Sequence, residues 1–180
     1  MRTFFSLQSV FRTRNLVLMA LMAALTFVLS QFTIAIGDTF KLLSLSYLPG
    51  AVVGCLFGPW AGVAFGFVAD TVGYIARPMG PWFPGYALSA MIVNFIYALF
   101  LYRQRLSVPR VTLAHISQTL LVTLGVNYLW NIIMYGAAAG TFFTGQRIVN
   151  NIVQIPLHVF LTWMFCRLAR RLEAGRISHA

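Results

Sequence analysis

The chain of 180 residues carries few charges for its length and is strongly apolar. Hydrophobic residues make up 59%, charged residues 9%, and the mean hydropathy is +0.80. A soluble domain usually carries about a quarter charged residues, so this composition excludes an ordinary soluble domain and indicates an integral membrane protein. The net charge of +10 does not indicate nucleic-acid binding, because the sequence offers no hydrophilic domain to hold a duplex.

Apolar stretches long enough to cross a bilayer recur along the chain. A spanning helix needs about 20 apolar residues, with roughly 17–25 tolerated. We therefore expect one all-α domain over residues 1–180, a compact bundle of six transmembrane helices at 15–36, 43–58, 60–76, 86–104, 112–136 and 147–170. The second and third helices are short and meet at Gly58-Pro59, a strong break. Because the chain stays hydrophobic after the first helix, we interpret that helix as a membrane span and not as a cleaved signal peptide.

The basic residues predict the orientation of this bundle. Ten of the thirteen fall in three clusters between apolar stretches: Arg2, Arg12 and Arg14; Arg103, Arg105 and Arg110; Arg167, Arg170, Arg171 and Arg176. Positively charged loops stay in the cytoplasm, so the clusters predict that both termini are cytoplasmic, with arginines near anionic lipid. The isolated cations Lys41, Arg77 and Arg147 then lie in or next to the outward segments 37–42, 77–85 and 137–146, where they can meet an anionic solute.

Polar residues share helix faces inside the apolar stretches. Polar groups in a membrane usually face the bundle interior or a watery cavity. Four sets of residues recur three or four positions apart, each set on one predicted helix: Asp70, Tyr74 and Arg77; Tyr86, Ala90, Asn94 and Tyr97; Asn127 and Asn131; Arg147, Asn151, Gln154 and His158. They predict a pocket in the outer half of the bundle. Structural alternatives stay open: Asp70 can neutralise an arginine, His158 can be a satisfied interior residue, and Asn94 and Gln154 can join helices.

Aromatic residues and cations together predict the chemistry of a ligand. A concave site with cations at its mouth and aromatic rings around it suits a flat aromatic ligand with carboxylates, because rings stack on rings and cations pair with carboxylates. Trp82 and Phe83 have an alternative use as interfacial anchors, and Lys41 can simply be solvated.

Catalysis and metal binding have little support in the sequence. Three acidic residues leave few carboxylates for acid–base chemistry, and a Walker A loop is absent, so the chain cannot hydrolyse ATP alone. Ser89 and His158 are the only faint candidates for a nucleophile and its base. We expect no enzyme activity, no metal and no cofactor, with Cys55 and Cys166 as buried thiols instead of a disulfide.

Small residues recur at helix-packing spacing. Gly50, Gly54 and Gly58 form one series, which Gly62 and Gly66 continue. Such residues let helix backbones approach closely in lipid, so we interpret the series as packing within the bundle. Ala20, Ala23 and Ala24 form a similar stripe on the first helix, for which packing within the bundle and docking of a partner protein stay open as alternatives.

Several of these stretches resemble a known family. The run from Asp38 to Arg103 is similar to the substrate-binding S components of energy-coupling factor (ECF) vitamin transporters, and specifically to the folate group. The matching stretches are Phe40-Lys41 leading into Tyr47-Leu48-Pro49-Gly50, Gly54 to Pro59, Gly66 to Asp70, and Phe83 to Tyr86 followed by Ser89-Ala90. Ala20-x-x-x-Ala24 resembles the motif by which S components contact their transmembrane partner.

The resemblance implies a multi-pass protein of a bacterial plasma membrane that captures folate outside and docks on a transmembrane T component with two ATPase subunits for inward release. With folate as the ligand, helical spacing leads us to expect Lys41, Arg77 and Arg147 near its carboxylates. We expect rings from Tyr74, Trp82, Phe83, Tyr86 and Trp130, and hydrogen bonds from Asp70, Asn131 and Gln154. The alternatives are an S component for another vitamin such as riboflavin or thiamin, a membrane enzyme or assembly factor, and a stand-alone secondary transporter, for which the expected inverted repeat is not evident.

Overall fold

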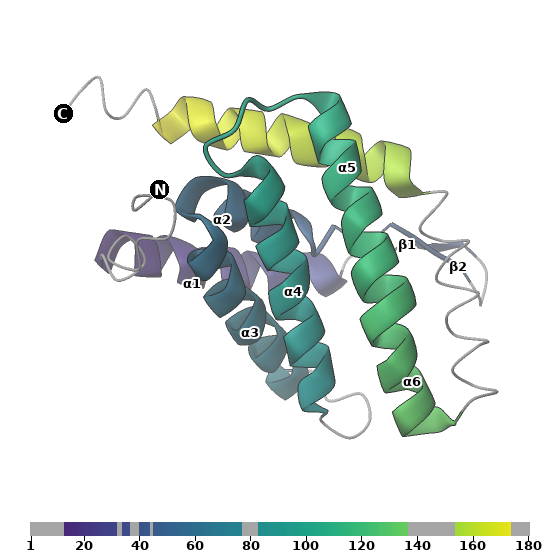
Figure 1. The fold of residues 1–180 in the computed structure, drawn as a ribbon. Coiled ribbons are helices and arrows are strands. Elements are labelled where there is room, and N and C mark those ends of the chain that lie inside the picture. Colours follow the sequence, from purple (N-terminus) through teal and green to yellow (C-terminus); the bar gives the residue numbers. More distant parts are fainter. Residues whose placement is uncertain are drawn as a thin grey trace.

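The computed structural model describes residues 13–31, 34–36, 40–43, 45–76, 83–136 and 154–173. Apart from two short strands, the regular elements in these ranges are helices (Figure 1). They are α1 (Thr13–Gln31), β1 (Ile34–Ile36), β2 (Phe40–Leu43), α2 (Leu48–Phe57), α3 (Pro59–Ala76), α4 (Pro84–Leu101), α5 (Val108–Gln118), the π-helix η2 (Thr119–Val126), α6 (Asn127–Tyr135) and a helix at 154–173.

The first helix is shorter than the sequence predicted. Helix α1 ends at Gln31, and Ile34–Ile36 form a strand that pairs antiparallel with Phe40–Leu43. The prediction of helix up to residue 36 is therefore wrong, and the fold contains a small sheet besides its helices. β-branched isoleucines fit a strand well, and pairing with β2 satisfies their backbone groups, which explains why this apolar run leaves the helix.

Helix α2 lies at the centre of the bundle. Its residues from Leu48 to Cys55 are buried, and Ala51 and Val53 are fully inaccessible. The helix ends where Gly58 adopts a φ of 95°, a conformation that glycine accepts without steric cost. Helix α3 begins at the next residue, Pro59, whose fixed φ suits the first turn of a helix. This is the break that the sequence predicted.

Glycines on α2 and α3 let both helices contact α4 closely. A Cβ atom on Gly62 would lie 2.9 Å from the backbone oxygen of Asn94, and one on Gly66 would lie 2.6 Å from the backbone oxygen of Ala90. Gly54 likewise faces Ala98. Packing within the bundle therefore explains this glycine series, as the sequence analysis favoured.

Helices α5, η2 and α6 follow one another without a break from Val108 to Tyr135. In the described part of the chain, two helical stretches are long and apolar enough to cross a membrane, Pro84–Leu101 and Val108–Met134. Helix α4 has 18 residues, which at 1.5 Å per residue gives about 27 Å, close to the ~30 Å of hydrocarbon in a bilayer. The stretches Asn15–Ser30 and Leu48–Phe57 are apolar but shorter.

The helix at 154–173 crosses the bundle near the C-terminal end of α4 (Figure 1). Arg170 fastens it there, because its guanidinium donates hydrogen bonds to the backbone oxygens of Leu101 and Gln104 and to Cys55 Sγ. The oxygen of Leu101 belongs to the last turn of α4, where carbonyls lack partners inside the helix, and that of Gln104 lies just beyond the helix. Cys55 and Cys166 are both buried and free within one apolar core cluster, as predicted.

Candidate ligand-binding site

An aromatic cluster forms where the N-terminus of α4 meets α6. Phe83 precedes α4 in an extended conformation, with Pro84 in the first helical turn. Its ring lies 5.4 Å from the ring of Trp130 and 5.9 Å from that of Tyr86, both in edge-to-face geometry. Such geometry is the favoured one for aromatic pairs. Gly85 makes the arrangement possible, since a Cβ atom there would lie 2.8 Å from Trp130 Cδ2.

Hydrogen bonds join the same two helices around this cluster. The hydroxyl of Tyr86 donates to Asn131 Oδ1 at 2.9 Å. The indole Nε1 of Trp130 donates to Ser89 Oγ at 3.2 Å, and that hydroxyl donates to the backbone oxygen of Gly85 at 3.1 Å. Trp130 and Asn131 are therefore held in defined orientations against α4. The Ser89 hydroxyl therefore accepts one hydrogen bond and donates the other. Its proton goes to a backbone oxygen and not to the base that would activate a nucleophile.

Two polar atoms in this region are buried without a partner. They are Nδ2 of Asn131 and Oδ1 of Asn127, one turn apart on α6. Asn131 is only 2% exposed, and a buried amide without a hydrogen bond costs about 1–3 kcal/mol. A free donor and a free acceptor on the helix that supplies Trp130 suit a planar ligand with polar edges. We call Phe83, Tyr86, Ser89, Asn127, Trp130 and Asn131 the aromatic site.

The π-helix η2 precedes these asparagines directly. It runs from Thr119 to Val126, and α6 begins at Asn127. A π-turn is wider than an α-turn, so it rotates the residues after it relative to those before it, and such turns are frequent at functional sites. The face that α6 turns toward α4 is therefore set by η2.

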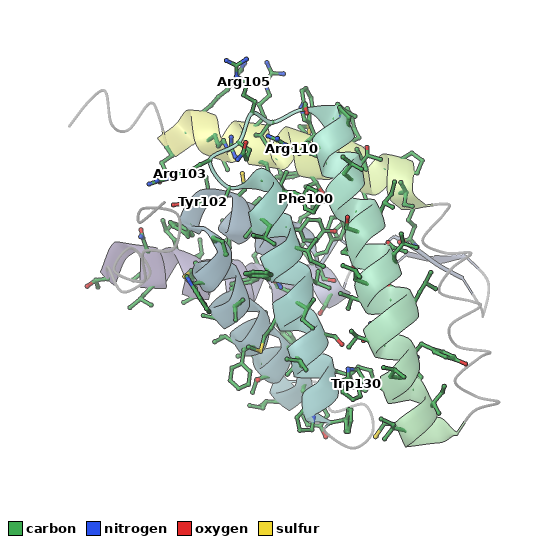
Figure 2. The ribbon with its side chains drawn as sticks, viewed as in Figure 1. Phe100, Tyr102, Arg103, Arg105, Arg110 and Trp130 are labelled. Carbon is green, nitrogen blue, oxygen red and sulfur yellow. The ribbon has the colours of Figure 1, made fainter. Side chains whose placement is uncertain are left out.

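The aromatic site lies at one end of the bundle, and the segment that contains Arg103, Arg105 and Arg110, which we call the basic loop, lies at the other. Figure 2 shows Trp130 near the lower ends of α4 and α6, whereas Arg103, Arg105 and Arg110 lie at the upper end. The two groups are separated by the whole length of α4 (Pro84–Leu101). The aromatic site is therefore at the end of the bundle away from these arginines.

A second polar cluster lies deeper in the bundle. Tyr97 Oη is 3.0 Å from His115 Nδ1, and His115 Nε2 is 3.2 Å from Thr162 Oγ1. The ring of His158 packs 4.3 Å from that of Tyr47, and its Nε2 is buried without a partner. Tyr97 is eleven residues beyond Tyr86, about 16 Å along α4, so this cluster joins helices at a different level from the aromatic site.

The predicted binding residues are placed as follows. Phe83, Tyr86, Trp130 and Asn131 come together in the aromatic site. Asp70 and Tyr74 are half-buried on α3, and Gln154 is half-buried at the start of the last helix. The backbone of Lys41 pairs with Ala35 in the sheet. Arg77, Trp82 and Arg147 lie outside the described residues.

Residues outside the predicted set also belong to the site. Gly85 and Ser89 were not predicted as ligand contacts, although they lie in the stretches Phe83 to Tyr86 and Ser89-Ala90 that carry the family resemblance. Asn127 was recognised on a polar helix face, but only its unpaired Oδ1 shows that it differs from a packing residue. The predicted row on α4 does not face one pocket, because Asn94 contacts the glycines of α2 and α3 whereas Tyr97 contacts His115.

The alanine stripe on α1 divides between surface and core. Ala20 and Ala24 are exposed, whereas Ala23 is 7% exposed and packs with Val53 and Phe65. The docking role expected of Ala23 therefore has no surface to act through, and the exposed pair on this helix is Ala20 and Ala24.

A helical bundle with two stretches long and apolar enough to cross a membrane, and with aromatic and polar side chains gathered between two helices, fits the class of membrane proteins that bind a small solute. Comparison with known proteins gives the family. Residues 14–165 match the family described as "ECF transporter, substrate-specific component", and the chain belongs to this family. Its relatives are transporter components and not enzymes, in agreement with the sequence analysis.

Two curated relatives are folate transporters. The chain is 32% identical over 158 residues to "Folate transporter FolT" of Clostridium novyi (strain NT), which covers 88% of this chain and 91% of the relative. It is 27% identical over 156 residues to "Folate transporter FolT" of Leuconostoc mesenteroides, covering 84% and 83%. A solved structure described as "Crystal structure of FolT bound with folic acid" has a TM-score of 0.75 and 30% identity, covering 86% of this chain and 92% of that one. The resemblance to the folate group is therefore confirmed.

Proposed function

We propose that this protein is a folate-binding S component and that the aromatic site holds the ring system of folate. The observation that carries the proposal is the pair of unpartnered buried atoms, Asn127 Oδ1 and Asn131 Nδ2, on the helix that also supplies Trp130, whose ring contacts that of Phe83. A pterin ring has both hydrogen-bond donors and acceptors on its edges and a face that stacks on aromatic side chains. The similarity to folate transporters supports the same ligand.

The remaining predicted contacts belong to the outer part of the ligand. Folate carries an aminobenzoyl ring and a glutamate beyond the pterin, and its carboxylates require cations or hydrogen-bond donors. Lys41, Arg77 and Arg147 stay our predictions for these carboxylates. Tyr74 and Trp82 stay predictions for the second ring, and Asp70 and Gln154 for polar contacts.

We also propose the transport role that the family implies. The chain crosses a bacterial plasma membrane six times with both termini in the cytoplasm, captures folate from outside, and docks on a T component with two ATPase subunits. The exposed pair Ala20 and Ala24 supports a docking face on α1, since small residues permit close helix approach.

Titration of the purified protein tests the ligand. We expect folate to quench tryptophan fluorescence with tight saturation, and riboflavin and thiamin to have no effect at the same concentrations. The Trp130→Phe variant should lose a large part of the quench, because Trp130 lies in the site, whereas Trp60→Phe, a matched change at the start of α3, should keep it. Saturable binding of riboflavin or thiamin without a response to folate would identify a sister S component instead.

Cysteine labelling tests the orientation. Both native cysteines are buried, so they give little background with a membrane-impermeant thiol reagent. In intact cells we expect Trp82→Cys to react and Arg105→Cys to be protected until the membrane is opened. The reverse pattern would place the basic loop outside and overturn the proposed capture from the exterior.

A further inference from the structure

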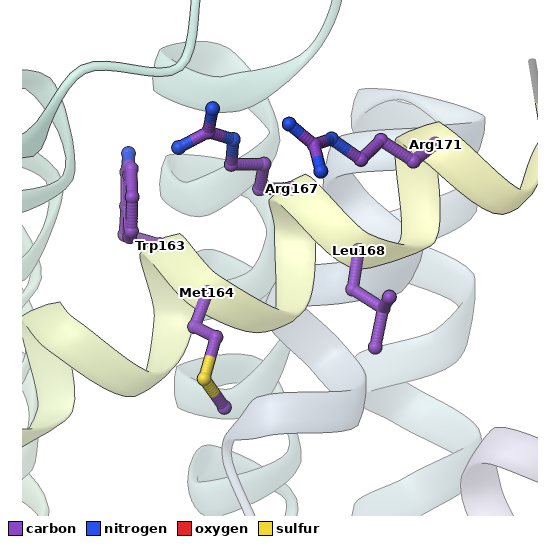
Figure 3. Close-up of a pocket in the computed structure, with 5 residues that line it drawn as sticks. All are labelled: Trp163, Met164, Arg167, Leu168 and Arg171. Carbon is purple, nitrogen blue, oxygen red and sulfur yellow. The ribbon is translucent and has the colours of Figure 1, made fainter.

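A groove lined by both basic and apolar side chains runs along the helix at 154–173. Its volume is about 390 Å³, and it is lined by Trp163, Met164, Arg167, Leu168 and Arg171. Figure 3 shows Trp163, Arg167 and Arg171 above the helix and Met164 and Leu168 below it. Residues four apart on a helix lie above one another, so a cationic row and an apolar row run side by side.

The two arginines of this groove are exposed and lack a counter-charge. Arg167 and Arg171 form no ion pair with the residues that the structure describes. Like charges four residues apart destabilise a helix, and this repulsion is relieved when an anion binds between them. Arg170 differs, because its guanidinium is used inside the bundle on Leu101, Gln104 and Cys55.

Trp163 holds one of the arginines in place. The guanidinium carbon of Arg167 lies 4.9 Å from the centroid of the Trp163 ring. Stacking on an aromatic face leaves the N–H groups at the edge of the guanidinium free to donate. A guanidinium fixed in this way matches the geometry of a phosphate group, which accepts two parallel hydrogen bonds.

The apolar row suits an anion that is part of an amphiphile. Met164 is 39% exposed and Leu168 is 51% exposed, although both line the same groove as the arginines. Leu157, Phe160 and Leu172 continue the exposed apolar surface of this helix in both directions. A small inorganic anion would use the arginines and leave this row uncovered. An acyl chain attached to a phosphate would cover both.

We propose that this groove binds an anionic phospholipid, with the headgroup phosphate between Arg167 and Arg171 and an acyl chain along Met164 and Leu168. The groove is on the helix that Arg170 fastens to the C-terminal end of α4, so the lipid belongs to the leaflet next to the basic loop. Basic pockets at the end of membrane helices suit anionic headgroups. The inference goes beyond the proposed folate function and does not depend on it.

Lipid titration of the purified full chain, measured by native mass spectrometry, tests the site. The probes are phosphatidylglycerol and phosphatidylcholine with identical acyl chains. We expect the unmodified chain to bind phosphatidylglycerol more tightly, and the double variant Arg167→Gln/Arg171→Gln to lose about tenfold to thirtyfold of that affinity, since each basic residue near anionic lipid contributes about 1 kcal/mol. Arg103→Gln/Arg105→Gln removes the same charge outside the groove and should keep the preference. Folate binding and thermal unfolding of both variants should match the unmodified chain.

Three results would overturn the proposal. Equal loss in both double variants would show that net charge alone attracts the lipid. An unchanged affinity in Arg167→Gln/Arg171→Gln would show that the groove is not the site. Displacement of phosphatidylglycerol by millimolar inorganic phosphate, with no effect of Leu168→Ser on lipid affinity, would show a simple anion site.

Discussion

Tyr86 and Asn131 connect the first turn of α4 to α6 by a hydrogen bond of 2.9 Å, in which the tyrosine hydroxyl donates to the amide oxygen. The bond fixes the orientation of the amide, because the oxygen is held and the Nδ2 group is left without a partner in the interior. A donor that is already oriented costs little entropy when a ligand binds. Tyr86 is therefore expected to support folate binding partly through Asn131.

Removal of the Tyr86 hydroxyl should weaken ligand binding. In Tyr86→Phe the ring remains beside Phe83, but Asn131 loses the bond that orients it. We expect the affinity for folate to fall about tenfold, which corresponds to ~1.4 kcal/mol, the scale of one hydrogen bond. Isothermal titration calorimetry measures this change. Tyr102→Phe is the matched control at the opposite end of α4, and equal losses in the two variants would show that the site lies elsewhere.

Replacement of Asn131 should separate binding from stability. In Asn131→Leu the bond to Tyr86 is lost, but so is the unpaired buried Nδ2, and a leucine is not costly in an apolar interior. The free energy of unfolding without ligand should change by less than about 1 kcal/mol, whereas the folate affinity should fall by tenfold or more.

Asn94→Ala provides the contrast for that experiment. Asn94 donates to the backbone oxygen of Ala90 and fills the space next to Gly62 and Gly66, so its loss should lower the unfolding temperature without changing the folate affinity. Thermal unfolding in detergent, with and without folate, measures both quantities. An Asn131 variant that loses stability as Asn94→Ala does, and keeps its affinity, would identify Asn131 as a packing residue.

Local chemistry explains which parts of the fold could be predicted from the sequence. Gly58-Pro59 ends one helix and begins the next because each residue has a backbone preference that acts locally. Phe83, Tyr86, Trp130 and Asn131 could be selected together because Phe83 comes directly before one helix and Tyr86 lies in its first turn, whereas Trp130 and Asn131 are adjacent on another helix. Their proximity across helices followed from the general tendency of polar groups in a membrane to face inward.

The parts that were missed depend on tertiary contacts. Ile34–Ile36 leave the helix because a partner strand is available, and nothing in an apolar triplet shows that partner. The π-helix Thr119–Val126 has no sequence signature of its own, yet it determines where Asn127 points. Tyr86, Asn94 and Tyr97 were expected on one face toward a single pocket, but each contacts a different neighbouring helix.

Glycine at position 66 should be required for the contact between α3 and α4. In Gly66→Ala the added methyl group would lie 2.6 Å from the backbone oxygen of Ala90, and a backbone atom cannot move aside as a flexible side chain does. We expect a loss of about 1–3 kcal/mol, the usual cost of overpacking. Gly73→Ala on the same helix meets nothing within 4 Å, so it should be neutral or stabilising by up to about 1 kcal/mol, because alanine favours a helix. Thermal unfolding of the two variants side by side gives the comparison, and a Gly66→Ala variant as stable as Gly73→Ala would contradict this account of the helix contact.

Arg170 should stabilise the bundle more than any exposed arginine of the basic loop. Its guanidinium reaches the backbone oxygens of Leu101 and Gln104 at the end of α4, where the helix dipole places partial negative charge. In Arg170→Gln these carbonyls lose a charged donor, and we expect a loss of about 1.5–3 kcal/mol. For a chain of this size that lowers the unfolding temperature by about 2–4 °C per kcal/mol. Arg105→Gln removes an exposed charge without such contacts and should leave the unfolding temperature unchanged. If both variants unfold at the same temperature, the contribution of Arg170 is limited to net charge, and the last helix is held by its apolar face alone.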